Sequence, residues 1–181
     1  MTDNKYFLST KRLGFRTWTS CDLDLALSLW GDFEVTELFD SRGQLSSTQV
    51  NDRLLNEIFL QNHHGVQYWP IFHLETSDHI GCAGLRPYDE SKSIMEIGFH
   101  VRSKFWRQGF ALEAASAVVD YAFNTRYVSG LFAGHNPRNI ASANLLKKLG
   151  FQYTHDEQYE PTGLMHPSYI LTSELYSSIM E

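Results

Sequence analysis

The residues with the clearest capacity for chemistry form a short basic stretch that ends in a glycine. Arg102, Lys104 and Arg107 are followed by Gly109, and the apolar pattern after Gly109 predicts a helix. The first N–H groups of a helix lack partners within it and carry partial positive charge, so this turn could hold an anion such as a phosphate. Gly109 has no side chain and would let the phosphate approach the backbone. An ordinary strand-to-helix turn is the other interpretation of these residues.

Other phosphate, metal and nucleophile motifs are absent from the sequence. The chain contains no G-x-x-x-x-G-K-[ST] loop, no G-x-G-x-x-G turn and no G-x-S-x-G elbow. Its histidines include the adjacent His63 and His64, but no H-E-x-x-H motif and no Cys/His metal spacing occurs. The two cysteines, Cys21 and Cys82, exclude a disulfide framework. We therefore expect no metal site.

Charge and composition are typical of a soluble globular protein. The chain has 15 Lys and Arg against 21 Asp and Glu, a net charge of −6, which disfavours general nucleic-acid binding. This acidity suits a cationic or amine partner, or it simply keeps the protein soluble. The N-terminus lacks the basic and apolar stretches of a signal peptide, and no apolar run approaches the ~20 residues that span a bilayer. We expect a cytoplasmic protein that does not contact membranes.

The elements around the basic turn are predicted as antiparallel strands followed by an α/β half. Two strands that are joined through a long helix should pair in parallel by a right-handed crossover. No repeat or linker indicates a domain boundary. Strands are predicted over 13–18, 67–74, 79–85, 94–101, 128–134, 151–155 and 169–172, and helices over 22–30, 48–61, 108–123 and 139–149.

The turn around Gly109 resembles the pyrophosphate loop of the GNAT superfamily of acyl-CoA-dependent N-acyltransferases, whose pattern is [RQ]-x-x-G-x-[GA]. The longer form W-G-x-G-Y-A-x-E-A is common in the ribosomal-protein N-terminal acetyltransferase-like branch, and this chain has W-R-Q-G-F-A-L-E-A at 106–114. Arg107 departs from that form, which has glycine there. The glycine and the final alanine of the shorter pattern, [RQ]-x-x-G-x-[GA], match Gly109 and Ala111.

Three further segments resemble the same family in the same order. The stretch 10–18, followed by Asp22, is similar to its opening strand and helix, and 79–85 is similar to its third strand. The stretch 136–151 resembles its N-x-x-S-x-x-x-x-x-K-x-G-F helix. The resemblance implies one GNAT domain over residues 8–176. Its fold would be α/β (α+β), with a mixed, mostly antiparallel sheet of about seven strands, helices on both faces and a splayed parallel strand pair.

The resemblance also implies where acetyl-CoA would bind as co-substrate. The pantetheine arm would lie beside the strand 94–101 and pair with Phe99 and Val101. Asn139 and Ser142 would contact the arm from the other wall, although Asn139 could equally be a helix cap. The pyrophosphate would bind the loop and helix start formed by Trp106, Arg107, Gln108, Gly109, Phe110, Ala111 and Leu112.

The implied reaction is direct transfer of the acetyl group to a primary amine. An N–H of Phe99 or His100 would polarise the acetyl carbonyl. Amines are mostly protonated at neutral pH, so a base must take the proton. Glu96, Gly98 and His100 share one face of the strand, and Glu96 is the first candidate for the base, with His100 second. The alternatives are a solvated Glu96 and a structural His100.

The group that protonates the leaving thiolate is not identified by the resemblance. Many GNAT enzymes use a tyrosine seven residues after the Asn139 equivalent, where this chain has Leu146. Ser142 is the hydroxyl that remains nearby, as in the ribosomal-protein branch. Its alternative role is packing or local capping.

The acceptor is either a protein N-terminal amine or a small-molecule amine. The loop 156–168 closes over the acceptor in this family, and here it carries Asp156, Glu157 and Glu160. These carboxylates could attract a cationic amine or form a solvated face. An open groove beside this loop would favour a peptide, and a closed pocket would favour a metabolite. A homodimer and a non-catalytic acyl-CoA-binding regulator on the same fold stay open.

Overall fold

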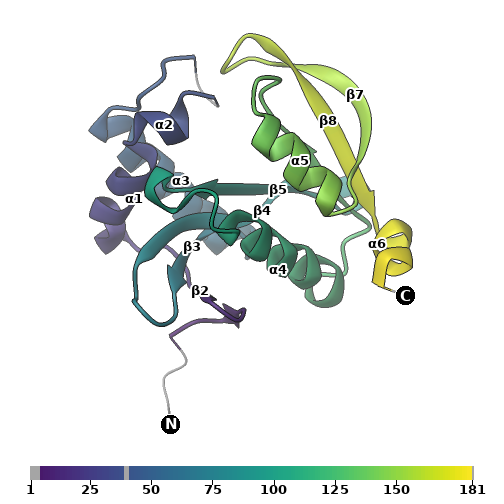
Figure 1. Ribbon diagram of the computed structural model, residues 1–181, viewed down its shortest axis with the longest axis horizontal. Coiled ribbons are helices and arrows are strands. Elements are labelled where there is room, and N and C mark those ends of the chain that lie inside the picture. The colour runs from purple at the N-terminus through teal and green to yellow at the C-terminus, as the bar shows by residue number, and fades with distance from the viewer. Residues whose placement is uncertain (1–4, 39–40, 181) are drawn as a thin grey trace.

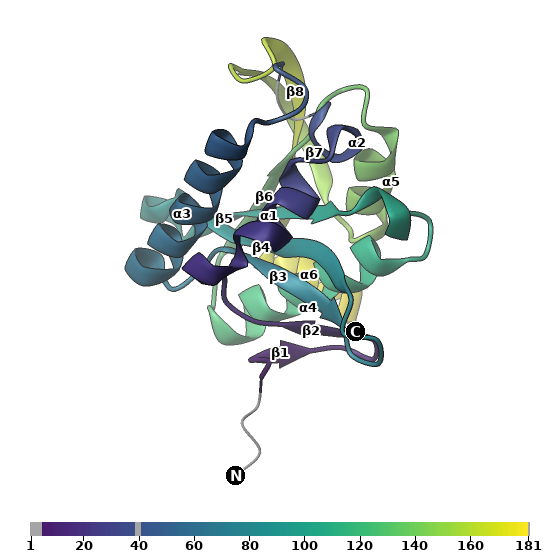
Figure 2. The same cartoon turned by 90° about the vertical axis from the view of Figure 1, so that its left-hand side faces the viewer.

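One sheet of eight strands runs through residues 5–38 and 41–180, the parts of the chain that our computed structural model describes. The strand order is β1-β2-β3-β4-β5-β6-β8-β7, and every neighbouring pair is antiparallel except β5 and β6. Figures 1 and 2 show the sheet with helices on both faces. The strands are β1 (Leu8–Ser9), β2 (Leu13–Phe15), β3 (Tyr68–His73), β4 (His79–Asp89), β5 (Ile94–Val101), β6 (Gly130–Gly134), β7 (Gln152–Tyr159) and β8 (Leu164–Thr172).

Two hydrophobic cores lie on opposite faces of this sheet. The larger core contains the apolar stripe of the long helix that precedes β6, together with Leu146 from the next helix. The second core contains Trp30 and Leu54 from the first and third helices. The helices are α1 (Leu23–Trp30), α2 (Phe33–Thr36), α3 (Ser47–His64), α4 (Phe110–Thr125), α5 (Ile140–Lys148) and α6 (Ser173–Met180).

The alternation of side chains along β4 separates the two cores. Ala83 and Leu85 are fully buried in the larger core, whereas Cys82 is fully buried in the second. Successive residues of a strand point to opposite faces, so both faces of this central strand are covered. This explains why residues 80–85 of β4 form an unbroken apolar run instead of alternating.

The predicted fold class is confirmed, including the parallel pairing of the strand at 94–101 with the strand that follows the long helix. The sheet has eight strands where about seven were expected, because Leu8–Ser9 pairs with β2 as an additional edge strand. Two residues are too few to show the alternation that identifies a strand in sequence. The short helix α2 and the C-terminal helix α6 were likewise not predicted.

The predicted loop 156–168 is wrong, since most of it belongs to a long hairpin. β7 and β8 pair from Gln152↔Ile170 to Tyr159↔Leu164 and leave only a short turn at 160–163. β7 is an edge strand whose residues are nearly all exposed, so it shows no apolar alternation. Pro167 lies beyond Ser168, the last β8 residue that pairs with β6, and proline is tolerated at such an edge.

Of the helices in the described ranges, none combines the length and the apolar character that crossing a bilayer requires. The first four residues, on which part of the localisation expectation rests, lie outside those ranges.

Candidate active site

The parallel strands β5 and β6 pair only at their beginnings. Over the described residues, the register joins Ile94–Glu96 to Gly130–Phe132 and goes no further. β5 continues to Val101, held by β4, while β6 continues to Gly134, which pairs with Ser168 of β8. The two strands therefore part beyond Glu96 and leave one edge of β5 unpaired.

The hydrogen-bond alternation shows which backbone groups of β5 face this unpaired edge. The N–H of Arg102 donates to the carbonyl of Ile80 at 2.9 Å, so even-numbered residues at this end of β5 bond to β4. The N–H and C=O groups of Phe99 and Val101 consequently point to the other side. Of the two N–H groups proposed to polarise an acetyl carbonyl, that of Phe99 faces the unpaired edge and that of His100 faces β4.

The carbonyl of Val101 already has one partner from the basic turn. The indole N–H of Trp106 donates to it at 2.7 Å, and Trp106 is itself 45 % exposed. A carbonyl oxygen can accept two hydrogen bonds, so this contact leaves Val101 able to pair with a ligand. It also fixes the beginning of the turn to the end of β5.

The turn before α4 combines two left-handed residues with an uncapped helix start. Arg107 has φ +60° and Gly109, the N-cap of α4, has φ +81°, with no side chain capping the helix. A Cβ atom at Gly109 would have only the Arg12 side chain within 4 Å, at 3.5 Å. The backbone at Gly109 is therefore approachable, and the first N–H groups of α4 lack a side-chain acceptor. These features fit an anionic group such as a pyrophosphate.

A charged contact from the N-terminal segment braces this turn. Glu113 in the first turn of α4 accepts from Arg12 Nε at 2.6 Å and from Thr10 Oγ1 at 2.6 Å. Arg12 Nη1 also donates to the carbonyl of Gln108 at 3.1 Å. The hydrogen bonds and the Arg12 guanidinium outweigh the effect of burial and lower the pKa of Glu113. Glu113 thus stays ionised and holds the turn against β2.

On the other side of β6, Asn139 caps α5. Its Oδ1 accepts from the backbone N–H of Ser142 at 3.0 Å, so the capping role foreseen as an alternative is present. The Asn139 amide retains its Nδ2 donor for another contact. Leu146 is buried in the larger core, at 1 % exposure.

Glu96 lies on the face of β5 that α1 and α3 cover. Burial raises the pKa of Glu96, while the charge of Arg86 and a hydrogen bond from the Tyr68 hydroxyl oppose that rise. Arg86 is the cross-strand partner of Glu96 on β4. Neither Tyr68 nor Arg86 was identified from the sequence, because Arg86 lies on β4, whose register with β5 appears only in the fold, and Tyr68 lies on β3, on the far side of β4.

His100 on the same face is a neutral, hydrogen-bonded histidine. Its Nδ1 accepts from the indole N–H of Trp30 at 3.2 Å and lies 3.6 Å from Cys82 Sγ. Burial, together with the charges of Arg53 and Arg86, holds the pKa of His100 well below its usual value. With the Nδ1 lone pair engaged, the ring matches the structural alternative better than the role of base.

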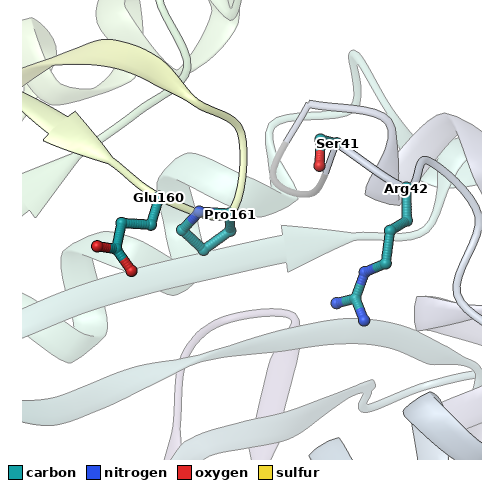
Figure 3. Close-up of a pocket in the computed structure, with 4 residues that line it drawn as sticks. All are labelled: Ser41, Arg42, Glu160 and Pro161. Carbon is teal, nitrogen blue, oxygen red and sulfur yellow. The ribbon is translucent and has the colours of Figure 1, made fainter.

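Two segments that are far apart in the sequence touch each other on the side where the acceptor was expected, beside the β7–β8 turn. The backbone N–H of Ser41 donates to the carbonyl of Pro161 at 2.8 Å, so the segment after α2 touches the β7–β8 turn. Figure 3 shows Pro161 of this turn across the gap from Ser41 and Arg42, with the Glu160 side chain pointing away from them. These four residues line a cavity of about 410 Å³.

A larger open cavity of about 680 Å³ lies beside the first, lined by residues of α2, of the β6–α5 loop and of the turn, including Phe33, Glu37, Asn136, Arg138, Thr162 and Leu164. The three acidic residues foreseen on this side are divided between strand and turn. Asp156 accepts from the Tyr153 hydroxyl at 3.3 Å, and Glu157 lies 3.5 Å from His155. Of the three, Glu160 lines the smaller of the two cavities described above. Among the described residues, no group of His, Cys, Asp and Glu could hold a metal ion.

Comparison with known proteins places this geometry in context. The family model of the acetyltransferase (GNAT) domain matches residues 12–152. The relative described as uncharacterized N-acetyltransferase p20 of Bacillus licheniformis is 30% identical over 147 residues, which cover 80% of this chain and 82% of the relative.

Two solved structures share the fold. A GNAT-family acetyltransferase of Bacillus anthracis superposes with a TM-score of 0.78 at 18% identity, covering 92% of this chain and 98% of that one. The ribosomal L7/L12 α-N-protein acetyltransferase in complex with coenzyme A superposes with a TM-score of 0.77 at 13% identity, covering 90% of this chain and 95% of that one.

Proposed function

The chain belongs to the GNAT acetyltransferase family and is an acetyl-CoA-dependent acyltransferase, and on that premise we propose that it acetylates a primary amine by direct attack. We also propose that residues 8–176 form one catalytic domain. The observation that carries the proposal is the divergence of β5 and β6 beyond Glu96, directly before the glycine turn of α4. An extended acyl-CoA arm and its phosphates fit these two adjoining features.

The binding residues in this proposal follow from the backbone geometry. The N–H groups at the start of α4 and the turn 106–109 would hold the pyrophosphate, with Arg107 and Lys104 adding positive charge. Phe99 and Val101 would pair with the pantetheine arm as a neighbouring strand does. Asn139 and Ser142 would contact the arm from the start of α5.

The bound acetyl-CoA would supply a thioester acetyl group at the unpaired edge of β5. The Phe99 N–H would stabilise the negative charge that develops on the acetyl oxygen. Glu96 would accept a proton from the ammonium form of the acceptor, because a buried carboxylate whose pKa is raised is a better base than an exposed one. Ser142 is the hydroxyl proposed near the departing sulfur.

The bridge between Ser41 and Pro161 supports a small-molecule amine as acceptor. An extended peptide laid across this side would have to pass the bridge, whereas a compact amine needs only a pocket. The two cavities beside the bridge are both open, so the bridge carries this choice of acceptor and the cavity volumes do not.

The test is an acceptor screen in which the purified protein and acetyl-CoA meet two sets of amines. One set contains small amines, and the other contains peptides with a free N-terminus. We expect release of free thiol and a mass gain of one acetyl group with members of the first set. Acceptance of peptides alone would contradict the small-molecule assignment. Thiol release that no amine raises above the rate with acetyl-CoA alone would contradict amine acetylation.

A further inference from the structure

We propose that Tyr68 is a positioning residue for Glu96. Its hydroxyl lies over Gly98, beside Glu96, and orients the Glu96 carboxylate toward the acceptor amine, while Arg86 and Glu57 hold Tyr68 in place. This inference rests on the proposed role of Glu96 as base. It adds a second group of residues, drawn from three other elements, to the site.

A row of glycines gives the Tyr68 ring its path to Glu96. Tyr68 on β3 pairs with Gly84 on β4, which pairs with Gly98 on β5. This pairing places Tyr68 two strands away from Gly98, and the absence of a side chain at Gly98 leaves room for the end of the tyrosine ring. A Cβ atom at Gly98 would lie 2.2 Å from Tyr68 Cζ and 2.4 Å from its hydroxyl oxygen. The hydroxyl therefore lies directly over Gly98, beside Glu96 on the same face.

A buried ion pair fixes Tyr68 from both sides. Glu57 of α3 is fully buried, and its Oε2 accepts from the backbone N–H of Tyr68 at 2.8 Å. The other oxygen of Glu57 binds Arg86 Nη2 in an ion pair. The Arg86 guanidinium in turn lies 4.1 Å from the centroid of the Tyr68 ring. Buried hydrogen-bonded charges of this kind hold their partners in one arrangement.

The charged groups around Glu96 come from two elements, β4 and α3. Arg86 of β4 and Arg53 of α3 favour its ionised form, and Glu57 of α3 opposes it. Tyr68 of β3 contributes the hydrogen bond, and His100 on β5 itself is neutral. Burial raises the pKa of Glu96, and the tyrosine hydrogen bond stabilises the carboxylate against that rise. Removing the hydroxyl should therefore raise this pKa further.

The test removes only the hydroxyl, in Tyr68→Phe. Losing a hydrogen bond to a charged group should move the titration of Glu96 upward by about one pH unit. The shift is measured without substrates by 13C NMR of the glutamate carboxyl carbons, with the Glu96 signal assigned from Glu96→Gln. The pH at which kcat/KM rises should move by the same amount, while CoA affinity stays unchanged. The titration of the acceptor amine contributes equally to the pH profiles of kcat/KM for the wild type and for Tyr68→Phe. The difference between these two profiles therefore reports the change in the pKa of Glu96.

Tyr121→Phe is the matched control, because it removes the same atom on the opposite face, where Tyr121 packs against Trp69. It should leave the Glu96 titration in place. An unshifted Glu96 titration in folded Tyr68→Phe would overturn the proposal. So would a loss of activity of equal size at every pH.

If Tyr68→Phe does not fold, the wild-type protein still decides the question. With tyrosine labelled at Cζ, one signal should titrate together with Glu96, and this titration should vanish in Glu96→Gln. Absence of such a signal would refute the contact. A Tyr68-dependent Glu96 titration in a protein that acetylates no amine would refute the proposed function and leave the contact standing.

Discussion

At the scale of single residues, Glu96 and His100 lie on the same face of β5 but have opposite electrostatic surroundings. Both are desolvated, which penalises their charged forms. The arginines near this face stabilise a carboxylate and destabilise an imidazolium. Their charges therefore oppose the effect of burial on the pKa of Glu96 and reinforce the effect of burial on the pKa of His100. The same environment therefore retains a usable base in one residue and a neutral ring in the other.

Glu96→Gln tests the proposed base while keeping the shape and the hydrogen-bonding capacity of the side chain. We expect kcat/KM at neutral pH to fall by about 10²- to 10⁴-fold, the usual loss when a positioned base is removed. The deficit should shrink as the pH approaches the pKa of the acceptor amine, because a neutral amine needs no base. The measurement is thiol release against pH, with CoA affinity as the control for folding.

Two results would contradict this assignment in different ways. A near-normal rate of folded Glu96→Gln at neutral pH would transfer the role to a water chain or to another residue. An equal loss at every pH would show that Glu96 positions the acceptor and does not remove its proton.

At the scale of elements, the junction of β5 and α4 joins the two halves of the proposed CoA site. Trp106 ties the turn to the end of the strand, and the Arg12–Glu113 contact ties the helix start to the N-terminal segment. The turn can therefore keep two left-handed residues without an internal cap. Such backbone conformations are sparse outside glycine and persist where surrounding contacts hold them.

Gly109→Val should weaken CoA binding, because a branched side chain would occupy the space through which a phosphate approaches the backbone. Valine at φ +81° is also strained, so a control must carry the same strain elsewhere. Gly163→Val serves, since Gly163 has φ +68° and its Cβ would meet no atom within 4 Å. Calorimetric titration with CoA should show lower affinity for the first variant only. Unchanged affinity in folded Gly109→Val would refute the assignment of the loop.

At the scale of the whole molecule, two depressed carboxyl pKa values link the fold to pH. Asp22 is paired with Arg16 at 2.7 Å, and Glu113 with Arg12 at 2.6 Å. Hydrogen bonds and these arginines lower both pKa values against the opposing effect of burial. A group whose pKa is lower in the folded state stabilises the fold fully at pH values above its pKa in the unfolded state. That stabilisation is lost as the pH falls through its pKa in the folded state.

The protein should accordingly lose stability as the pH falls below 4.5, the ordinary pKa of glutamate. At pH 7, Glu113→Gln should lower the free energy of unfolding by about 1–2 kcal/mol, as loss of a charged hydrogen-bond acceptor does. The difference from wild type should shrink as the pH falls through the folded-state pKa of Glu113, since Glu113 is protonated in both states below that value. Urea unfolding at pH 7 and at a series of acidic pH values measures this difference, and a difference that stays constant down to the lowest pH would contradict this account.

Local patterns in the sequence were sufficient to predict the elements that form the proposed CoA site. The alternation at 94–101, the helical stripe after Gly109 and the glycine between them predicted β5, α4 and the anion turn, and the structure has β5 with the same bounds. These signals are local because helix periodicity, glycine and strand alternation act within a few residues. The parallel pairing also followed, since a long helical connection leaves few other arrangements.

The surroundings of the proposed base and the shape of the acceptor side were decided by the tertiary structure alone. Tyr68, Arg86 and Glu57 come from β3, β4 and α3, and only the packing of the whole sheet and of α3 on its face brings them near Glu96. β7 is exposed nearly throughout, so no apolar pattern marked the length of the β7–β8 hairpin, and the contact of its turn with Ser41 joins segments more than a hundred residues apart. Sequence identifies a side chain that can hold a proton, but its pKa depends on burial and on neighbouring charges, which only the folded chain brings together.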